Sequence, residues 1–242
     1  MNPGILAIDI GGTGLKAAVV SEAGRMLSER LRVPTPHPCP PGRMLAVLAE
    51  LVRPLPAYDR IAIGFPGVVR DGRVVTAPHL DTRLWQGYEL AAALSGVLGG
   101  HPARMVNDAD MQGYALIRAS GLELVVTLGT GMGTALYRDG ELMPHMELSQ
   151  HPFRKDRTYD DYLGSEALAR IGRKRWNRRL GKALEMLRTL LNPDRVFLAG
   201  GNARLVGDDH PAWVHVSAGG TGMEGGAHLW RAPGPRRAAR KR

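Results

Sequence analysis

The chain has 242 residues, of which 44% are hydrophobic, so it can form one large domain or two modest domains with real cores. Its single cysteine, Cys39, excludes a disulfide framework and a cysteine-based zinc site within the chain, and indicates a reducing, cytoplasmic location. No apolar run reaches the roughly 18 residues of a membrane span, no signal-peptide pattern is present, and the formal net charge of +9 favours an anionic partner.

The first predicted element is a β-hairpin with a glycine-rich turn. Apolar residues 5–8 and 17–20 predict its strands, and Asp9-Ile10-Gly11-Gly12-Thr13-Gly14-Leu15-Lys16 lies between them. Glycines leave backbone N–H groups uncovered, which suits a phosphate oxygen, while Thr13 offers a hydroxyl and Asp9 a carboxylate for Mg²⁺. Taken alone, such a turn would favour a simple hairpin with a charged rim, so the rest of the chain has to decide.

The next hundred residues alternate between strands and helices. Extended segments are predicted at 26–33, 60–64 and 101–106, with a hairpin at 68–75. Helical spacing of apolar residues predicts helices at 44–52 and 88–98. The last of these strands ends at Asn107-Asp108.

The pattern then starts again. A helix is predicted over 110–120, followed by a second strand–turn–strand unit at 125–137. Its turn, Gly129-Thr130-Gly131-Met132-Gly133, is again rich in glycine and threonine. Neither turn is a P-loop or a dinucleotide-binding fingerprint, because no GxxxxGK[ST] occurs and each turn is followed by a strand.

The remainder is less regular. Residues 141–162 show no clear pattern. A long helix after Ser165 carries an apolar stripe that includes Trp176 and ends at Asn192-Pro193. Strands at 195–199 and 214–217 and a final helix at 223–231 complete the pattern.

The repeated order of elements predicts an α/β protein with two similar lobes facing each other across a cleft. We place the first, smaller lobe at residues 1–106 and the second at 107–222. The final helix, 223–232, is expected to pack back on the first lobe, and residues 233–242 are expected to form a basic, disordered tail.

Five motifs in register carry a family resemblance. They are Asp9-Ile10-Gly11-Gly12-Thr13, Gly64-Phe65-Pro66-Gly67, Asn107-Asp108-Ala109-Asp110, Leu128-Gly129-Thr130-Gly131-Met132-Gly133 and Ala199-Gly200-Gly201. In this order they resemble the ROK-family sugar kinases, and Arg175-Trp176-Asn177-Arg178-Arg179-Leu180 before Pro193-Asp194 resembles the polyphosphate glucokinase branch. The resemblance implies an actin/hexokinase-like (ribonuclease H-like) fold.

The resemblance also implies roles for individual residues. Asp108 matches the general base that accepts the proton of the sugar 6-hydroxyl. The residues implied in binding the phosphoryl donor are Asp9, Gly11, Gly12, Thr13, Lys16, Gly129, Thr130 and Gly131. Those implied in binding sugar are Gly67, Asn107, Asp108, Glu147 and Asp161. A structural alternative for Asn107 and Asp108 is a helix N-cap, a position that both residue types favour.

The chain departs from the family pattern at the sugar motif. The family's Glu-x-Gly-His reads Glu147-Leu148-Ser149-Gln150 here, with His151 one place late, and Asp161 stands where the family usually has a glutamate. The cysteine-rich zinc motif of the family is absent, so no zinc site is expected.

A dense group of basic residues lies near the start of the long helix. Lys174, Arg175 and Arg178 belong to it and are candidates for a track that binds a polyphosphate chain. The alternative is an ordinary solvated helix face. Nucleic-acid binding is not favoured, because aromatic residues make up only 5% and no nucleic-acid-binding module is recognisable.

These observations predict a kinase that transfers a phosphoryl group from polyphosphate, ATP or both to the 6-hydroxyl of glucose or a close hexose, with Mg²⁺. The resemblance implies a homodimer with no membrane or nucleic-acid partner. Three alternatives remain: an ATP-only hexokinase of different specificity, a sugar-binding protein without catalysis, and a sugar-sensing regulator. The regulator is disfavoured because only four residues precede Ile5.

Overall fold

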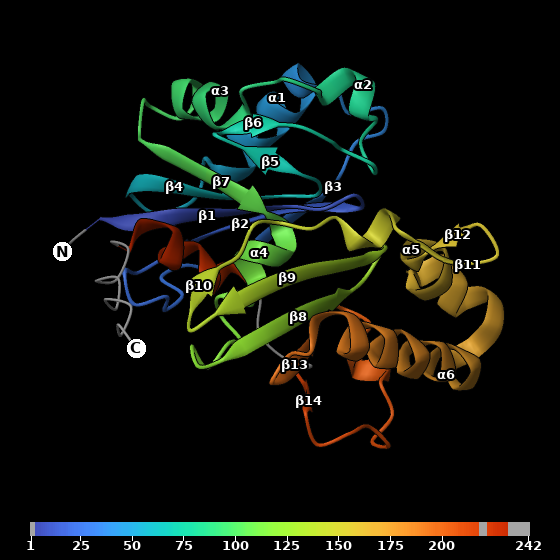
Figure 1. The fold of residues 1–242 in the computed structure, drawn as a ribbon. Helices are drawn as coiled ribbons and strands as arrows, with labels where there is room; N and C mark the ends of the chain where they lie inside the picture. Colours follow the sequence, from blue (N-terminus) through green and yellow to red (C-terminus); the bar gives the residue numbers. More distant parts are fainter. Residues whose placement is uncertain (1–2, 218–221, 232–242) are drawn as a thin grey trace.

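The computed structural model describes residues 3–217 and 222–231 and shows a mixed α/β protein of two lobes, each built on a five-stranded sheet (Figure 1). The α/β class and the two-lobed arrangement predicted from the sequence are therefore confirmed. The predicted basic tail, 233–242, lies outside the described residues. No helix within the described ranges is both long enough and apolar enough to cross a membrane.

The first sheet has the strand order β3-β2-β1-β4-β7. Its central strand β1 (Gly4–Ile10) pairs antiparallel with β2 (Gly14–Val20) and parallel with β4 (Tyr58–Phe65). The edges are β3 (Leu31–Pro34), antiparallel to β2, and β7 (Ala103–Asn107), parallel to β4. All residues of β1 are buried, because both faces of this sheet are covered.

The second sheet, with order β10-β9-β8-β13-β14, repeats this topology. Strand β8 (Leu122–Leu128) pairs antiparallel with β9 (Met132–Arg138) and parallel with β13 (Arg195–Ala199). Strand β10 (Glu141–Leu142) pairs antiparallel with β9, and β14 (Val214–Val216) lies parallel to β13. The two glycine-rich turns therefore occupy equivalent places in the two lobes.

Helices cover the outer faces of both sheets (Figure 1). On the first sheet these are α1 (Pro41–Val52), α2 (Thr82–Trp85) and α3 (Leu90–Val97), whose buried side chains share one core with the strands. On the second sheet they are α5 (Tyr159–Leu163) and α6 (Ser165–Leu191). The predicted apolar stripe of α6 is buried, and the helix is kinked at Gly172, where φ is 75°.

Two short helices occupy the inner side, between the lobes. Helix α4 (Asp108–Gly113) contacts β4 in the first sheet and β8 and β9 in the second. The 3₁₀ helix η3 (Met223–Trp230) packs on β1, β2, β4 and α4. The remaining elements are β5 (Val69–Arg70), β6 (Arg73–Val74), η1 (Leu148–Gln150), β11 (Pro152–Arg154), β12 (Arg157–Thr158) and η2 (Ala203–Leu205).

Two predicted elements are shorter in the structure, for physical reasons. The strand predicted over 26–33 is confined to β3, because the Ser28 hydroxyl accepts the hydrogen bond of the Val19 amide, at 2.9 Å, in place of a strand partner. The helix predicted over 110–120 ends at Gly113. The chain then turns so that the amides of Arg118 and Ser120 donate to the buried Glu123 carboxylate.

Two further segments differ from the prediction. Residues 141–162 are not irregular but contain β10, η1, the β11–β12 hairpin and the start of α5. The final helix is a 3₁₀ helix, in which Gly225 and Gly226 lie against the Met111 carbonyl and the Cβ atoms of Ala7 and Ala62. Such close packing leaves no room for a side chain at either glycine.

Candidate active site

A cleft of about 860 Å³ lies between the two lobes and is lined by both glycine-rich turns. The first lobe contributes the β1–β2 turn and the loops after β4 and β6. The second lobe contributes the β8–β9 turn, the segment 145–149, Asp160 and the start of α6. All of the donor-binding residues predicted from the two turns line this cleft, as do Gly67, Asn107, Asp108 and Glu147.

The first turn is held from behind by the loop that follows β3. The Thr35 hydroxyl donates to the Gly11 carbonyl at 2.6 Å, and the His37 ring contacts the Gly12 carbonyl at 3.0 Å. At the base of the turn, Lys16 donates to Asp9 at 2.7 Å, because the two residues are direct partners across β1 and β2. With its carbonyls engaged, the turn has amide N–H groups to offer to an anionic oxygen.

The second turn is braced in the same way. The Ser165 hydroxyl donates to the Gly129 carbonyl at 2.7 Å, and the Asn202 amide donates to the same carbonyl at 3.1 Å. Gly131 is required by close contact, since a Cβ atom there would lie 2.4 Å from a carboxylate oxygen of Asp160. Two braced turns of equivalent topology, one in each lobe, therefore face one cleft.

Asp108 and its neighbour Asn107 end β7 and begin α4. Asn107 is the N-cap, and its side chain accepts from the amides of Ala109 and Asp110. The amide group of Asn107 also donates to the carbonyls of Phe65, at 3.3 Å, and Gly67, at 3.1 Å. The structural role considered for Asn107 is thus present, and it fixes the position from which Asp108 enters the cleft.

The Asp108 carboxyl group has a strongly altered acidity. Burial, followed by the nearby negative charge of Asp9, raises its pKa from 3.8 to about 7, although the Ala109 amide donates to it at 2.9 Å. Glu147 and Asp110 add to the rise. A carboxylate with a pKa near neutrality is suited to accepting a proton from a hydroxyl group.

Glu147 belongs to a small polar network that the sequence did not predict. The Ser149 hydroxyl donates to one of its carboxylate oxygens, and Nε2 of His145 lies 3.7 Å from the other. Nδ1 of His145 lies 3.1 Å from the Asp110 carboxylate. Asp110 is buried and paired with this histidine.

The structure places Asp160, not Asp161, in the cleft. Asp161 is exposed and does not line the cleft. Its carboxylate accepts from the Thr158 amide and completes a capping box at the start of α5. Asp160 accepts from the Met132 amide at 2.6 Å and from Gln150 at 3.0 Å, and it faces His79. The sugar contact predicted for Asp161 is therefore not supported by its position.

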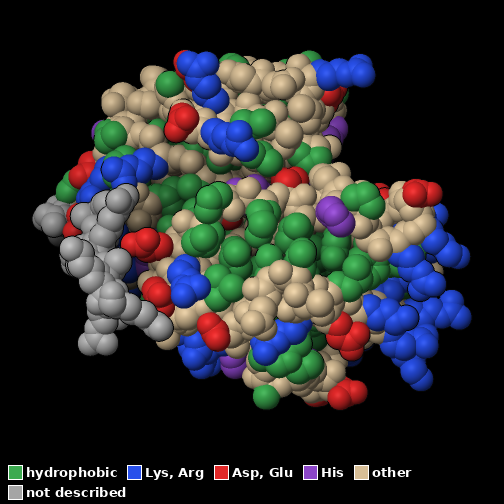
Figure 2. All heavy atoms as spheres, in the orientation of Figure 1, with side chains coloured by type: hydrophobic (Ala, Val, Ile, Leu, Met, Phe, Trp, Pro, Cys, Tyr) green, Lys and Arg blue, Asp and Glu red, His purple; other side chains and the backbone are tan. Residues whose placement is uncertain are grey.

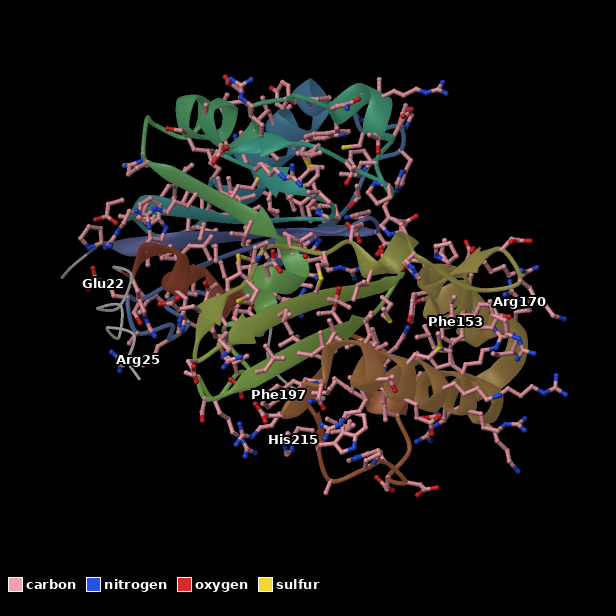
Figure 3. All side chains as sticks on the ribbon, viewed as in Figure 1. Glu22, Arg25, Phe153, Arg170, Phe197 and His215 are labelled. Atoms are coloured by element: carbon pink, nitrogen blue, oxygen red, sulfur yellow. The ribbon has the colours of Figure 1, made fainter. Side chains whose placement is uncertain are left out.

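The basic residues of α6 lie outside the cleft. Lys174, Arg175 and Arg178 are exposed and do not line it, and Lys and Arg side chains gather over this end of the second lobe in Figure 2. Arg170, labelled in Figure 3, points outward from the same end. The cationic side chains that do line the cleft beside Lys16 are those of Arg30, Arg32 and Arg204.

The sequence did not predict that Arg32 lines the cleft, because its position depends on the register between β2 and β3. It is the direct β3 partner of Lys16 on β2, and its guanidinium lies over Gly14, where a Cβ atom would approach it to 2.9 Å. His79, His145 and Asp160 were also missed as cleft residues.

Asp9 is suited to holding Mg²⁺ together with phosphate oxygens. It lines the cleft beside the first turn, and phosphoryl-transfer enzymes bind Mg²⁺ through one or two carboxylates plus substrate phosphates. Within residues 3–217 and 222–231, no cluster of three or more His, Cys, Asp or Glu side chains could form a complete protein metal site. Such a metal would therefore depend on the phosphate ligand.

Comparisons with known proteins agree with this geometry. A model of the ROK family matches residues 5–146, more than half of the chain. Polyphosphate glucokinase of Mycobacterium tuberculosis is 29% identical over 211 residues, which cover 80% of this chain and 76% of that protein.

Solved structures show the same fold over nearly the whole length. The inorganic polyphosphate/ATP-glucomannokinase from Arthrobacter sp. strain KM has a TM-score of 0.81 at 28% identity, covering 94% of this chain and 98% of that one. A ROK-family glucokinase from Streptomyces griseus, in complex with glucose and AMPPNP, has a TM-score of 0.76 at 21% identity, covering 93% and 98%. The two-lobed, actin/hexokinase-like fold predicted from the sequence is confirmed.

Proposed function

Because the chain belongs to the ROK family and has the two-lobed fold of its sugar kinases, we propose that it transfers a phosphoryl group from polyphosphate or ATP to the 6-hydroxyl of glucose or a close hexose. The observation that carries this proposal is the place of Asp108. Its carboxyl group lies in the cleft between two braced glycine-rich turns, and its pKa is raised to about 7.

Asp108 is the general base of the proposed reaction. It accepts the proton of the sugar hydroxyl as the hydroxyl oxygen attacks the terminal phosphorus of the donor, and the bond between that phosphorus and the leaving phosphate oxygen breaks. Burial and the negative charges of Asp9 and Glu147 keep the proton affinity of Asp108 high enough for this role. Asn107 positions Asp108 by capping α4 and by holding the Phe65–Gly67 turn.

The two turns hold the phosphates. The amides of Gly11 and Gly129 close their own turns by donating to the carbonyls of Gly14 and Gly131. The N–H groups of Gly12, Thr13, Thr130 and Gly131 and the side chains of Lys16 and Thr13 are suited to the phosphate oxygens. Asp9 would hold Mg²⁺, which would neutralise the negative charge that develops on the phosphate oxygens during transfer. Enclosure between the lobes limits access of water, which competes with the sugar as acceptor.

Names of similar proteins support both donors. The glucomannokinase is named for polyphosphate and ATP, and the mycobacterial relative for polyphosphate. The arginines at the cleft suit either donor, because both present a chain of phosphates. The family resemblance also supports a homodimer, which light scattering of the purified protein would test.

The proposed function is tested by a matrix of donors and sugars. Purified protein with Mg²⁺ is given ATP or long-chain polyphosphate, each with glucose, mannose, N-acetylmannosamine or 6-deoxyglucose, and sugar phosphate is measured. We expect product with glucose or mannose and none with 6-deoxyglucose, which lacks the attacking hydroxyl. Sugar binding with no consumption of either donor would overturn the proposal in favour of a non-catalytic sugar-binding protein.

A further inference from the structure

His145 lies on the wall of the cleft between two carboxylates, and the reaction described above gives it no task. Its Nδ1 is 3.1 Å from Asp110 Oδ1, and its Nε2 is 3.7 Å from Glu147 Oε2. The side chain is only 9% exposed, yet it lines the cleft together with Glu147.

The orientation of the ring is fixed by its Asp110 side. Asp110 belongs to the first turn of α4, its side chain is 3% exposed, and its backbone carbonyl accepts a hydrogen bond from the Tyr137 hydroxyl. The Asp110 amide is in turn directed at the Asn107 side chain, at 3.4 Å. With Nδ1 held by this anchored carboxylate, Nε2 is directed toward Glu147, which lines the cleft.

The ring carries a proton on both nitrogens at neutral pH. Burial favours the neutral ring, but the carboxylates of Asp110 and Glu147 outweigh this effect and raise the pKa of His145 to about 9. Burial likewise acts to raise the pKa of Glu147, but the nearby His145 ring and the hydrogen bond from Ser149 outweigh it and lower that pKa. A charged donor therefore stands beside a charged acceptor.

The Nε2–H group is not used within the protein. Among the described residues it has no hydrogen-bond partner, although the atom is fully buried. The 3.7 Å between Nε2 and the Glu147 oxygen is longer than a hydrogen bond. A buried donor without a partner is costly, so a ligand that satisfies it is favoured.

We propose that His145 is a sugar-contacting residue that, with Glu147, selects the acceptor: its Nε2–H donates to a hydroxyl oxygen of the sugar, and that hydroxyl donates to the Glu147 carboxylate. A hydroxyl group is both donor and acceptor, so one hydroxyl matches the pair. This inference rests on the proposed function, since it takes the ligand of the cleft to be a sugar.

The test compares two histidines with the same substitution. His145→Gln removes the charged donor. The control, His151→Gln, changes an exposed histidine in the same segment of the chain. Glucose or mannose binding is measured by calorimetry without donor, and the KM values for sugar and ATP by activity. We expect His145→Gln to weaken sugar binding by about 10- to 100-fold, the worth of a hydrogen bond to a charged group, with the KM for ATP unchanged. His151→Gln should match wild type.

A panel of monodeoxyglucoses identifies the hydroxyl. Wild type should lose affinity for one deoxy sugar by at least the factor that glucose loses with His145→Gln, and the variant should distinguish that sugar from glucose less strongly than wild type, because only the bond to Glu147 remains. Equal binding of glucose by wild type and a folded His145→Gln variant, or discrimination by the variant as strong as that of wild type, would overturn the inference.

A second variant covers the case in which His145→Gln does not fold. Asp110→Asn keeps the shape of the anchor and removes the charge that holds the proton on His145. The titratable groups that act on the ring are Asp110 on α4 and Glu147. Asp108 and His79 act on Glu147 in turn, and the Tyr137 hydroxyl donates to the Asp110 backbone carbonyl. Sugar affinity of Asp110→Asn should decline as pH rises from about 6 to 8, where the wild-type affinity stays constant. An affinity of Asp110→Asn that does not change with pH would contradict the inference.

The two proposals fail differently. Wild-type protein that binds sugar without consuming donor would refute catalysis and leave the role of His145 open to the same binding measurements. Wild-type protein that neither binds nor phosphorylates any hexose would refute both.

Discussion

His79 of the first lobe and Asp160 of the second lobe form an ion pair across the cleft, with Nε2 and Oδ2 3.3 Å apart. Hydrogen bonding to Asp160 raises the pKa of His79, against the opposing effect of burial. Asp160 also accepts from the Met132 amide at 2.6 Å, so the second glycine-rich turn is tied to the first lobe through one carboxylate.

This arrangement predicts different effects for two adjacent aspartates. Asp160→Asn removes the charge that attracts His79 and presents an amide to the donor of Gln150, so the lobes should close less readily. We expect kcat/KM for the sugar to fall about tenfold or more, as is usual for loss of a hydrogen bond to a charged group. Asp161→Asn alters only the cap of α5 and should leave kcat/KM within about twofold. A larger loss with Asp161→Asn would restore the sugar-binding role first expected of that residue.

Asp108→Asn tests the proposed base directly. The amide keeps the shape of the side chain but cannot accept the hydroxyl proton, so kcat should fall by about 10²- to 10⁴-fold. Sugar affinity, measured by calorimetry without donor, should stay close to that of wild type. A folded variant with near-normal kcat would show that Asp108 serves only the start of α4.

The pH dependence of the reaction should report the pKa of Asp108. A base must be deprotonated to act, so kcat/KM should rise with pH, with its midpoint at about 7, and level off at higher pH. Glu147→Gln removes one of the charges that raise this pKa, so the midpoint of the profile should move to lower pH. A midpoint that stays in place in Glu147→Gln would mean that another group controls the profile.

A part of the site could be predicted where its residues are neighbours in the sequence, and not where residues far apart in the chain are brought together by folding. The glycine-rich turns, Asp9 and Asp108 were predicted because each stands in a compact motif between recognisable strands. Arg32 was missed because its place beside Lys16 depends on the register of β3, and the predicted strand ran too early. His79 and His145 meet their carboxylate partners only through the packing of the two lobes and of α4 on the second sheet.

That Asp160 lines the cleft, where Asp161 was expected, has a similar origin. Successive residues of a helix point about 100° apart, so a shift of one position changes which carboxylate faces the cleft. The sequence offered two adjacent aspartates, and the capping box with Thr158 decides between them.

The apolar stripe of α6, by contrast, was readable from spacing alone, and it predicts a stability effect. Trp176 is fully buried, and its indole N–H donates to the Leu163 carbonyl at 2.8 Å. Trp176→Ala should lower the free energy of unfolding by about 3–5 kcal/mol, measured by urea denaturation. Leu190→Ala on the same helix removes a side chain that is 66% exposed, and should change it by about 0.5 kcal/mol or less. Equal effects of the two substitutions would contradict the burial of this stripe.

The last prediction separates the two groups of basic residues. Arg30, Arg32 and Arg204 line the cleft, so their replacement by Ser should raise the KM for both ATP and polyphosphate. Lys174, Arg175 and Arg178 lie about two and a half to three and a half turns beyond Ser165 on α6, outside the cleft. Only a long polyphosphate chain that continues out of the cleft could reach them.

Replacement of Lys174, Arg175 and Arg178 by Ser should therefore raise the KM for long-chain polyphosphate and leave the KM values for ATP, short-chain polyphosphate and sugar unchanged. The same variant should show a weaker salt dependence for the long chain, because fewer counterions are released on binding. The measurement is a set of titrations with chains of different length at two salt concentrations. If this variant keeps the wild-type KM at every chain length, the basic face of α6 is an ordinary solvated surface, and the cleft arginines alone account for donor binding.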